Sequence, residues 1–179
     1  ANLVPLVGVI TWGWDTFSII FLFWFENVII GGFNAVRMMF ASGPPTKDMM
    51  TSDVPVTKNS MRAAKLFIIP FFLFHYGIFT MVHGIFIFSF FGSSYGADGP
   101  VELFGAIAPV ILSKGLGGAV LALVIHHAYS FFFDYLRTGE YRETNPLIQM
   151  FKPYGRIVVV HMTIIIGGFL SFIAPILTL

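Results

Sequence analysis

Four long apolar runs dominate the pattern of hydrophobic and polar positions along the chain, at about residues 15–40, 64–91, 115–136 and 156–177. Each run has about the 20 residues that a helix needs to cross a bilayer, whereas a membrane strand needs only about ten residues of alternating polarity. The pattern therefore predicts an all-α polytopic membrane helix bundle with four full transmembrane helices. Residues 1–12 are apolar but too few to cross alone, so they predict a partial N-terminal helix.

Three polar connections separate the apolar runs, at residues 41–60, 92–114 and 137–154. The first holds three prolines and predicts an extended loop. The second predicts a turn followed by a short interfacial helix over about residues 101–112, and the last predicts a short surface helix over about residues 146–151. The whole chain is expected to form a single membrane domain.

The distribution of basic residues predicts the orientation of the bundle. The first connection with its flanks holds five of the chain's ten Lys and Arg residues, the last holds four, and the middle holds one. Because cytoplasmic loops carry an excess of Lys and Arg, the loops at 41–60 and 137–154 are predicted to be cytoplasmic and 92–114 to lie outside. The expected location is the inner membrane of a bacterium, with several crossings.

Composition supports a membrane protein and excludes several other classes. The 179 residues are 56% hydrophobic and 11% charged, against about 25% charged in a soluble domain. The 22 phenylalanines cannot all be buried in one soluble globule of this size, so the bilayer is the expected partner. The net charge of +1 gives no field that would attract nucleic acid, and the absence of cysteine excludes disulfides and thiolate-ligated metals.

A few ionisable side chains lie deep inside the apolar runs and are candidates for function. Each costs a few kcal/mol near the bilayer centre unless it is paired, coordinated or neutral. Counting about 1.5 Å per residue from the ends of the runs places three of them near the midplane, one toward the cytoplasm and one toward the outer surface. These predicted metal ligands are Glu26, His75, His127, His161 and His83.

Imidazoles and one carboxylate that converge from several helices suit a Zn, Cu or Fe ion better than Ca or Mg. The sequence thus predicts an intramembrane metal site, in a protein with an oxidoreductase or metal-handling role. His127 is preferred to His126 because it shares a helix face with Ser130 and Asp134. A haem held by His75 and His127 is an alternative cofactor, although no haem motif is present.

Three other interpretations remain open from the residues. The histidines can simply hydrogen-bond to hydroxyl groups and backbone carbonyls. The protein can be a non-catalytic accessory subunit that packs its Phe-rich faces against other membrane subunits, or it can form a proton pathway from the same polar groups. At the cytoplasmic ends of the runs, Asp134 is expected to pair with Arg37 or Arg156.

The chain also carries four motifs with distinctive spacing: WFEN at 24–27, HYGxFxxVHGxF at 75–86, HxxSFxxDYL at 127–136 and PYGRxxxxHxT at 153–163. With these motifs, the chain from Trp14 onward resembles an uncharacterised bacterial integral-membrane family, one of the domains of unknown function. The resemblance implies a fold and a set of residues but no reaction, because that family has no assigned activity. Its pattern includes His127 and not His126, in agreement with the helix-face argument.

Overall fold

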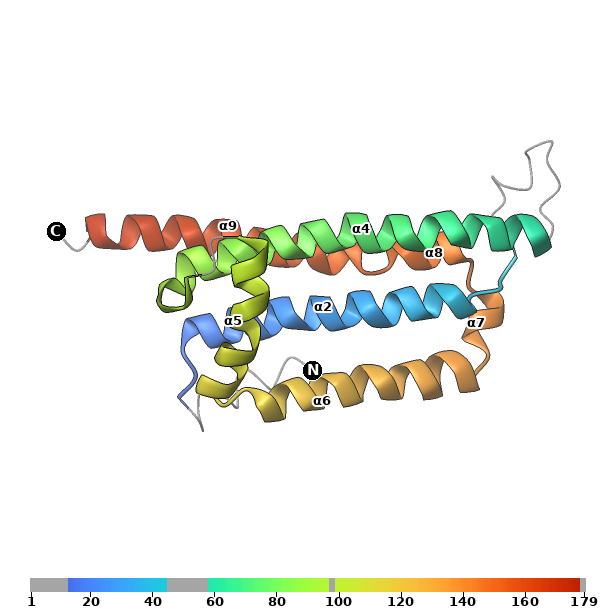
Figure 1. Cartoon of the computed structure of the whole chain (residues 1–179), viewed down its shortest axis with the longest axis horizontal. Helices are drawn as coiled ribbons and strands as arrows, with labels where there is room; N and C mark the ends of the chain where they lie inside the picture. Colours follow the sequence, from blue (N-terminus) through green and yellow to red (C-terminus); the bar gives the residue numbers. More distant parts are fainter. Residues whose placement is uncertain (1–12, 45–57, 97–98, 178–179) are drawn as a thin grey trace. The chain divides into compact units, whose positions relative to one another are not determined.

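A computed structural model describes residues 13–44, 58–96 and 99–177 of the chain (Figure 1). Within these residues the regular structure is entirely helical, which confirms the predicted all-α bundle. The partial helix predicted over residues 1–12 and most of the loop predicted over residues 41–60 lie outside the described residues.

The long helices coincide with the predicted apolar runs to within two residues at their ends, except that α4 begins about six residues before its run. They are α2 (Thr16–Phe40), α4 (Lys58–Phe91), α6 (Gly117–Tyr129) with its π-helical continuation η2 (Ser130–Arg137), and α9 (Tyr154–Leu177). The short elements are η1 (Ser93–Tyr95), α5 (Pro100–Ser113), α7 (Glu140–Glu143) and α8 (Pro146–Phe151). The short helix predicted over residues 101–112 is therefore present as α5, and its position at the membrane interface stays a prediction.

Among the residues that the structure describes, three helical stretches are long and apolar enough to cross a membrane: Thr16–Phe40, Met61–Phe91 and Gly117–Arg137. The chain is therefore a membrane protein, and the large apolar side chains exposed on these helices suit contact with lipid. Helix α9 has 24 residues, and its crossing of the membrane stays a prediction.

The chain divides into two compact units, which are described separately. Unit 1 comprises Ala1–Asn27, Phe79–Leu123 and Gly155–Leu179, and unit 2 comprises Val28–Ile78 and Val124–Tyr154.

The core of unit 1 is built from aromatic rings and the small residues that let them approach. Phe17 packs edge-on against Phe88, with ring centroids 5.4 Å apart. Gly84 of α4 lies so close to the indole of Trp24 that a Cβ atom there would be 2.6 Å from the ring. Leu103 of α5 contacts the same glycine, and α5 runs across the direction of α4 (Figure 1). A small residue at position 84 is therefore what allows α2 and α5 to pack on α4.

In unit 2, the segment that contains α7 and α8 runs back along α2. The backbone N–H of Ser42, just after α2, donates to the carbonyl of Tyr141 at 2.7 Å. Further along the segment, the Gln149 side chain donates to Asn34 Oδ1 at 2.6 Å, and Asn34 Nδ2 donates to the carbonyl of Gln149 at 3.1 Å. Asn34 precedes Ser42 by eight residues, so the segment retraces about two turns of α2.

Helix α8 has the residue bounds that the sequence predicted, and it buries one face while Ile148 and Phe151 on the other face are 50% and 59% exposed, as expected of a surface helix. The side chain of Asn145 accepts a hydrogen bond from the first turn at 2.8 Å, and Pro146 occupies the start of the helix, as favourable N-terminal residues do. Pro146, Gln149 and Met150 are buried. The Asn34–Gln149 contacts hold this buried face against α2, because an amide left without partners inside the bundle would be costly.

Candidate functional site

Three helices of unit 1 are joined pairwise by polar contacts, which we call the three-helix polar cluster. Helix α2 is joined to α4, α2 to α9, and α4 to α9. The contacts are Trp24 Nε1–H to the carbonyl of Thr80 (2.6 Å), Arg156 to Glu26, and His83 to His161 (2.8 Å). Each of the three helix pairs is thus joined by one buried or half-buried polar contact.

The ion pair of the cluster joins Arg156 Nη2 to Glu26 Oε2. The Glu26 side chain is only 5% exposed, whereas Arg156 is 33% exposed. A buried carboxylate requires a compensating charge, and the guanidinium supplies it. Arg156 and His161 are five residues apart and hence about 140° around the axis of α9, so this helix presents the arginine to α2 and the histidine to α4.

The histidine pair joins His83 Nε2 to His161 Nδ1 at 2.8 Å, with the rings inclined by 65° and their centroids 5.0 Å apart. His83 is buried and His161 is exposed on the side of α9. The backbone carbonyl of Phe79 also accepts a hydrogen bond from the His83 imidazole. Because Nε2 faces His161, that bond belongs to Nδ1, and the lone pair of His83 is on Nε2, toward its partner histidine.

His75 lies in unit 2, where its Nδ1 is 2.9 Å from the hydroxyl of Tyr154. The Phe71 ring stacks on the imidazole at 5.4 Å, and Tyr154 meets the rings of Phe72 and Tyr76 edge-on. The Tyr154 hydroxyl therefore helps to hold the His75 imidazole inside an aromatic group.

His127 also lies in unit 2, on α6. Its ring is 6.2 Å from Phe33 and 5.2 Å from the neighbouring His126. His127 is half-buried and His126 is exposed, which is the orientation that the helix-face argument predicted.

Of the five predicted metal ligands, the structure thus brings His83 and His161 into contact. Glu26, in the same unit, contacts an arginine, whereas His75 and His127 belong to unit 2. No group of three or more His, Cys, Asp or Glu side chains suited to a metal ion forms among the residues that the structure describes.

Sequence reasoning missed the partners of Glu26 and His75, and one expected pair is wrong. Asp134 is exposed, and its carboxylate forms no ion pair in the described part of the chain. Arg37 instead donates to Ser130 Oγ at 2.9 Å and lies over the ring of Tyr135, and the other expected partner of Asp134, Arg156, is taken by Glu26.

A spacing signal in the sequence could have found the helix pairing. His75 and His83 are eight residues apart on α4, and Tyr154 and His161 are seven residues apart on α9. Two neighbouring helices with polar side chains at nearly equal spacings can bring each side chain of one helix next to one of the other. In this chain His75 contacts Tyr154 within unit 2, and His83 contacts His161 within unit 1.

A family of unknown function (DUF6498) matches residues 1–178 of the chain. The chain belongs to this family. No curated protein and no solved structure matches it. Membership of a family of unknown function is therefore confirmed, and the matched range covers every residue of the three-helix polar cluster.

Proposed function

We propose that the protein is a metal-handling membrane protein that binds a Zn, Cu or Fe ion between His83 and His161. The observation that carries the proposal is the 2.8 Å separation of two imidazole nitrogens that come from different apolar helices. Imidazole is a ligand that suits all three metals, and helical bundles build metal sites from side chains on facing helices. The proposal keeps the expected location, the inner membrane of a bacterium.

The histidine pair needs little change to accept an ion. Two nitrogens that bind one tetrahedral Zn ion, each at about 2.0–2.1 Å, lie about 3.3 Å apart. His83 Nε2 and His161 Nδ1 would therefore separate by only about half an ångström from their 2.8 Å contact. The bond from His83 Nδ1 to the Phe79 carbonyl also matches the usual arrangement of a metal-bound histidine, whose second ring nitrogen donates to a fixed acceptor.

The proposed site has open coordination positions. Glu26 is engaged by Arg156, and His161 is exposed on α9, so the two histidines supply two ligands and the remaining positions face outward. Structural zinc sites use four protein ligands, whereas sites that act on bound molecules leave positions for water or substrate. Open positions therefore favour an ion that is passed on or that acts on a bound molecule.

Haem ligation and proton transfer fit this pair less well, whereas the haem expected between His75 and His127 stays a prediction. The axial nitrogens of a haem lie on opposite sides of the iron, about 4 Å apart, so a 2.8 Å contact favours a single ion. A proton that enters the pair at His161 would reach His83, whose other nitrogen already donates to the Phe79 carbonyl. A backbone carbonyl does not accept a proton for onward transfer, so the relay stops there.

Metal analysis of the purified full chain tests the proposal. The protein in detergent is loaded separately with Zn²⁺, Cu²⁺ and Fe²⁺, desalted and analysed, and we expect about one bound ion per chain for at least one metal. His83→Ala and His161→Gln should each weaken binding by about tenfold or more, because each removes one of two ligands. The matched control His126→Gln, at an exposed imidazole on α6, should leave binding unchanged. The proposal would be refuted if none of the three metals bound stoichiometrically, or if binding were unchanged in both histidine variants.

The exposure of His161 also favours a second candidate, an accessory subunit of a larger membrane complex. Around this histidine, Val158, Val159 and Met162 are 57%, 64% and 47% exposed. A polar imidazole on an apolar helix face is costly in lipid and is accommodated when another protein covers it. A photo-crosslinker at Val159 should then capture one protein in native membranes, and His161→Leu should leave the isolated chain folded but abolish that product. Crosslinking to lipid alone would exclude this candidate.

A further inference from the structure

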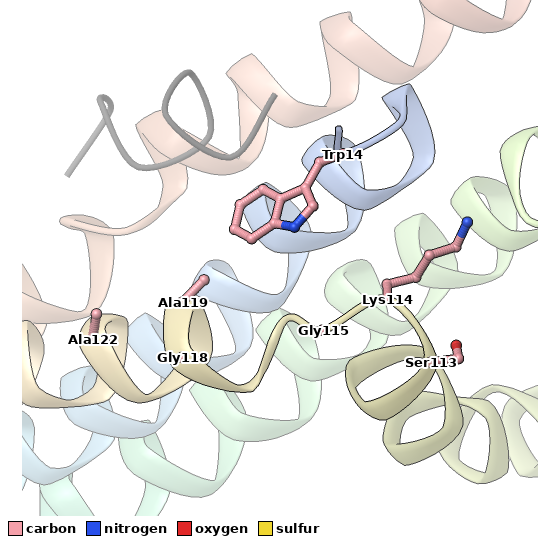
Figure 2. A pocket seen from close by; sticks show the side chains of 7 residues that line it. All are labelled: Trp14, Ser113, Lys114, Gly115, Gly118, Ala119 and Ala122. Atoms are coloured by element: carbon pink, nitrogen blue, oxygen red, sulfur yellow. The ribbon is translucent and has the colours of Figure 1, made fainter. Parts of the chain in front are cut away.

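Unit 1 contains a cavity of about 530 Å³, within the usual range of sites for small ligands (Figure 2). Its lining comes from the start of α2, the connection between α5 and α6, and the first turns of α6. The lining residues are Trp14, Ser113, Lys114, Gly115, Gly118, Ala119 and Ala122. Because both contributing span helices begin here, the cavity lies at one end of their apolar stretches.

One part of the lining is apolar and consists of small residues beside one aromatic ring. Gly118, Ala119 and Ala122 lie on the first turns of α6, and the indole of Trp14 faces the same space (Figure 2). A Cβ atom added at Gly118 would meet nothing within 4 Å. Small residues beside an aromatic ring leave room for an apolar chain, and tryptophan is enriched where membrane and water meet.

One lining residue of the cavity, Lys114, is a cation, and it is paired with the carboxylate of Asp15, which is adjacent to the lining residue Trp14 in the chain. Lys114 Nζ contacts Asp15 Oδ2 at 2.6 Å, and the two side chains are 32% and 49% exposed. Burial acts to raise the pKa of the Asp15 carboxyl, but hydrogen bonds from Lys114 and Ser18 outweigh it and hold that pKa at about 2. The carboxylate and the ammonium are thus both charged and both accessible at neutral pH.

We propose that this cavity binds a zwitterionic phospholipid with a phosphoethanolamine headgroup. The lipid phosphate would contact Lys114, its ammonium would donate to Asp15, and one acyl chain would lie over Ala119 and Ala122. An ion pair with no net charge favours a zwitterion over an anionic lipid, because Asp15 repels a headgroup that carries only negative charge. A primary ammonium is favoured over a quaternary one, because only the primary group can donate hydrogen bonds to a carboxylate.

Native mass spectrometry of the full chain in detergent tests the lipid site. The delipidated protein is offered an equimolar mixture of phosphatidylethanolamine, phosphatidylcholine and phosphatidylglycerol with identical acyl chains. We expect the first lipid to be retained about three- to fivefold over each of the others, the discrimination expected from exposed ion pairs. Ala122→Leu should abolish this retention by filling part of the cavity. Asp15→Asn should remove the preference for phosphatidylethanolamine over phosphatidylglycerol.

The control is Gly105→Leu on α5, an exposed glycine with nothing within 4 Å of its Cβ position, which should bind like the original chain. Equal retention of the three lipids, or unchanged preference in Ala122→Leu, would overturn the proposal. A further arm adds free phosphoethanolamine in millimolar excess. We expect it not to displace the lipid, and displacement by the free headgroup would show that the site takes a soluble ligand instead.

Discussion

Replacing Arg156 by leucine removes the cation that pairs with Glu26 and tests whether this ion pair holds α2 and α9 together. The Glu26 side chain is only 5% exposed, so the carboxylate cannot turn to water when the guanidinium is gone. We expect Arg156→Leu to lower the free energy of unfolding substantially, whereas Glu26→Leu/Arg156→Leu, which removes both charges, should recover most of the loss.

The size of the effect follows from the burial of the two partners. Removing one member of a buried ion pair costs about 3–5 kcal/mol, because an uncompensated charge stays in the interior. Arg156 is 33% exposed, which places this pair at the lower end, about 3 kcal/mol. In a chain of this length, 1 kcal/mol moves the melting temperature by about 2–4 °C, so the single variant should melt about 6–12 °C lower.

Thermal unfolding in one detergent provides the assay, run on the original chain, both single variants and the double variant as a double-mutant cycle. The matched control is Glu140→Gln, which breaks the exposed pair of Glu140 and Lys152, 2.9 Å apart and 44% exposed on both sides. That change should cost less than about 1 kcal/mol. The reasoning fails if Arg156→Leu melts like the control, or if the double variant is no more stable than either single variant.

Three further predictions concern topology, packing and pH. Cysteines placed at Ser60 and Ser94 should be labelled from opposite sides of the membrane, and labelling from one side would refute the predicted orientation. Gly84→Ala should destabilise the protein by about 1–3 kcal/mol in thermal unfolding, because its Cβ would lie 2.6 Å from the Trp24 indole ring. The control Gly77→Ala, on the same helix, should not destabilise the protein, because nothing lies within 4 Å of its Cβ position. The folded pKa of Asp15 is lowered from 3.8 to about 2, so its contribution to stability is present above about pH 4 and is lost as the pH falls toward 2. Melting curves from pH 6 to pH 2.5 should show this loss, of about 1 kcal/mol or less because the carboxylate is 49% exposed, and Asp15→Asn should lack it.

The helices could be predicted closely because their bounds depend on local signals. The apolar runs are long enough to identify the span helices, and the Asn145–Pro146 pair marks the start of α8. The π-helical stretch Ser130–Arg137 was not predicted, because its wider turn depends on how the helix packs and leaves no periodic pattern in eight residues.

The partners in the candidate site are harder to predict, because the depth of each side chain in the bilayer is estimated from the end of its apolar run. That estimate assumes that all runs begin at the membrane surface. In unit 2, however, Tyr154 at the start of α9 contacts His75, which is 17 residues after Lys58 at the start of α4, or about 25 Å of helical rise. Arg156 was accordingly assigned to the cytoplasmic edge, although it pairs with Glu26, ten residues into α2.

The segment that retraces α2 has a consequence for biosynthesis. Its helices α7 and α8 are too short to cross a bilayer, so this segment, which is predicted to be cytoplasmic, is not inserted as a spanning helix is. Its packing on α2 uses the Asn34 side chain as the partner of Gln149, so we expect it to pack once α2 is in place. We therefore expect the spanning helices to be inserted first and this segment to pack second, so that a nascent chain lacking Gln149 has no side-chain partner from this segment for Asn34.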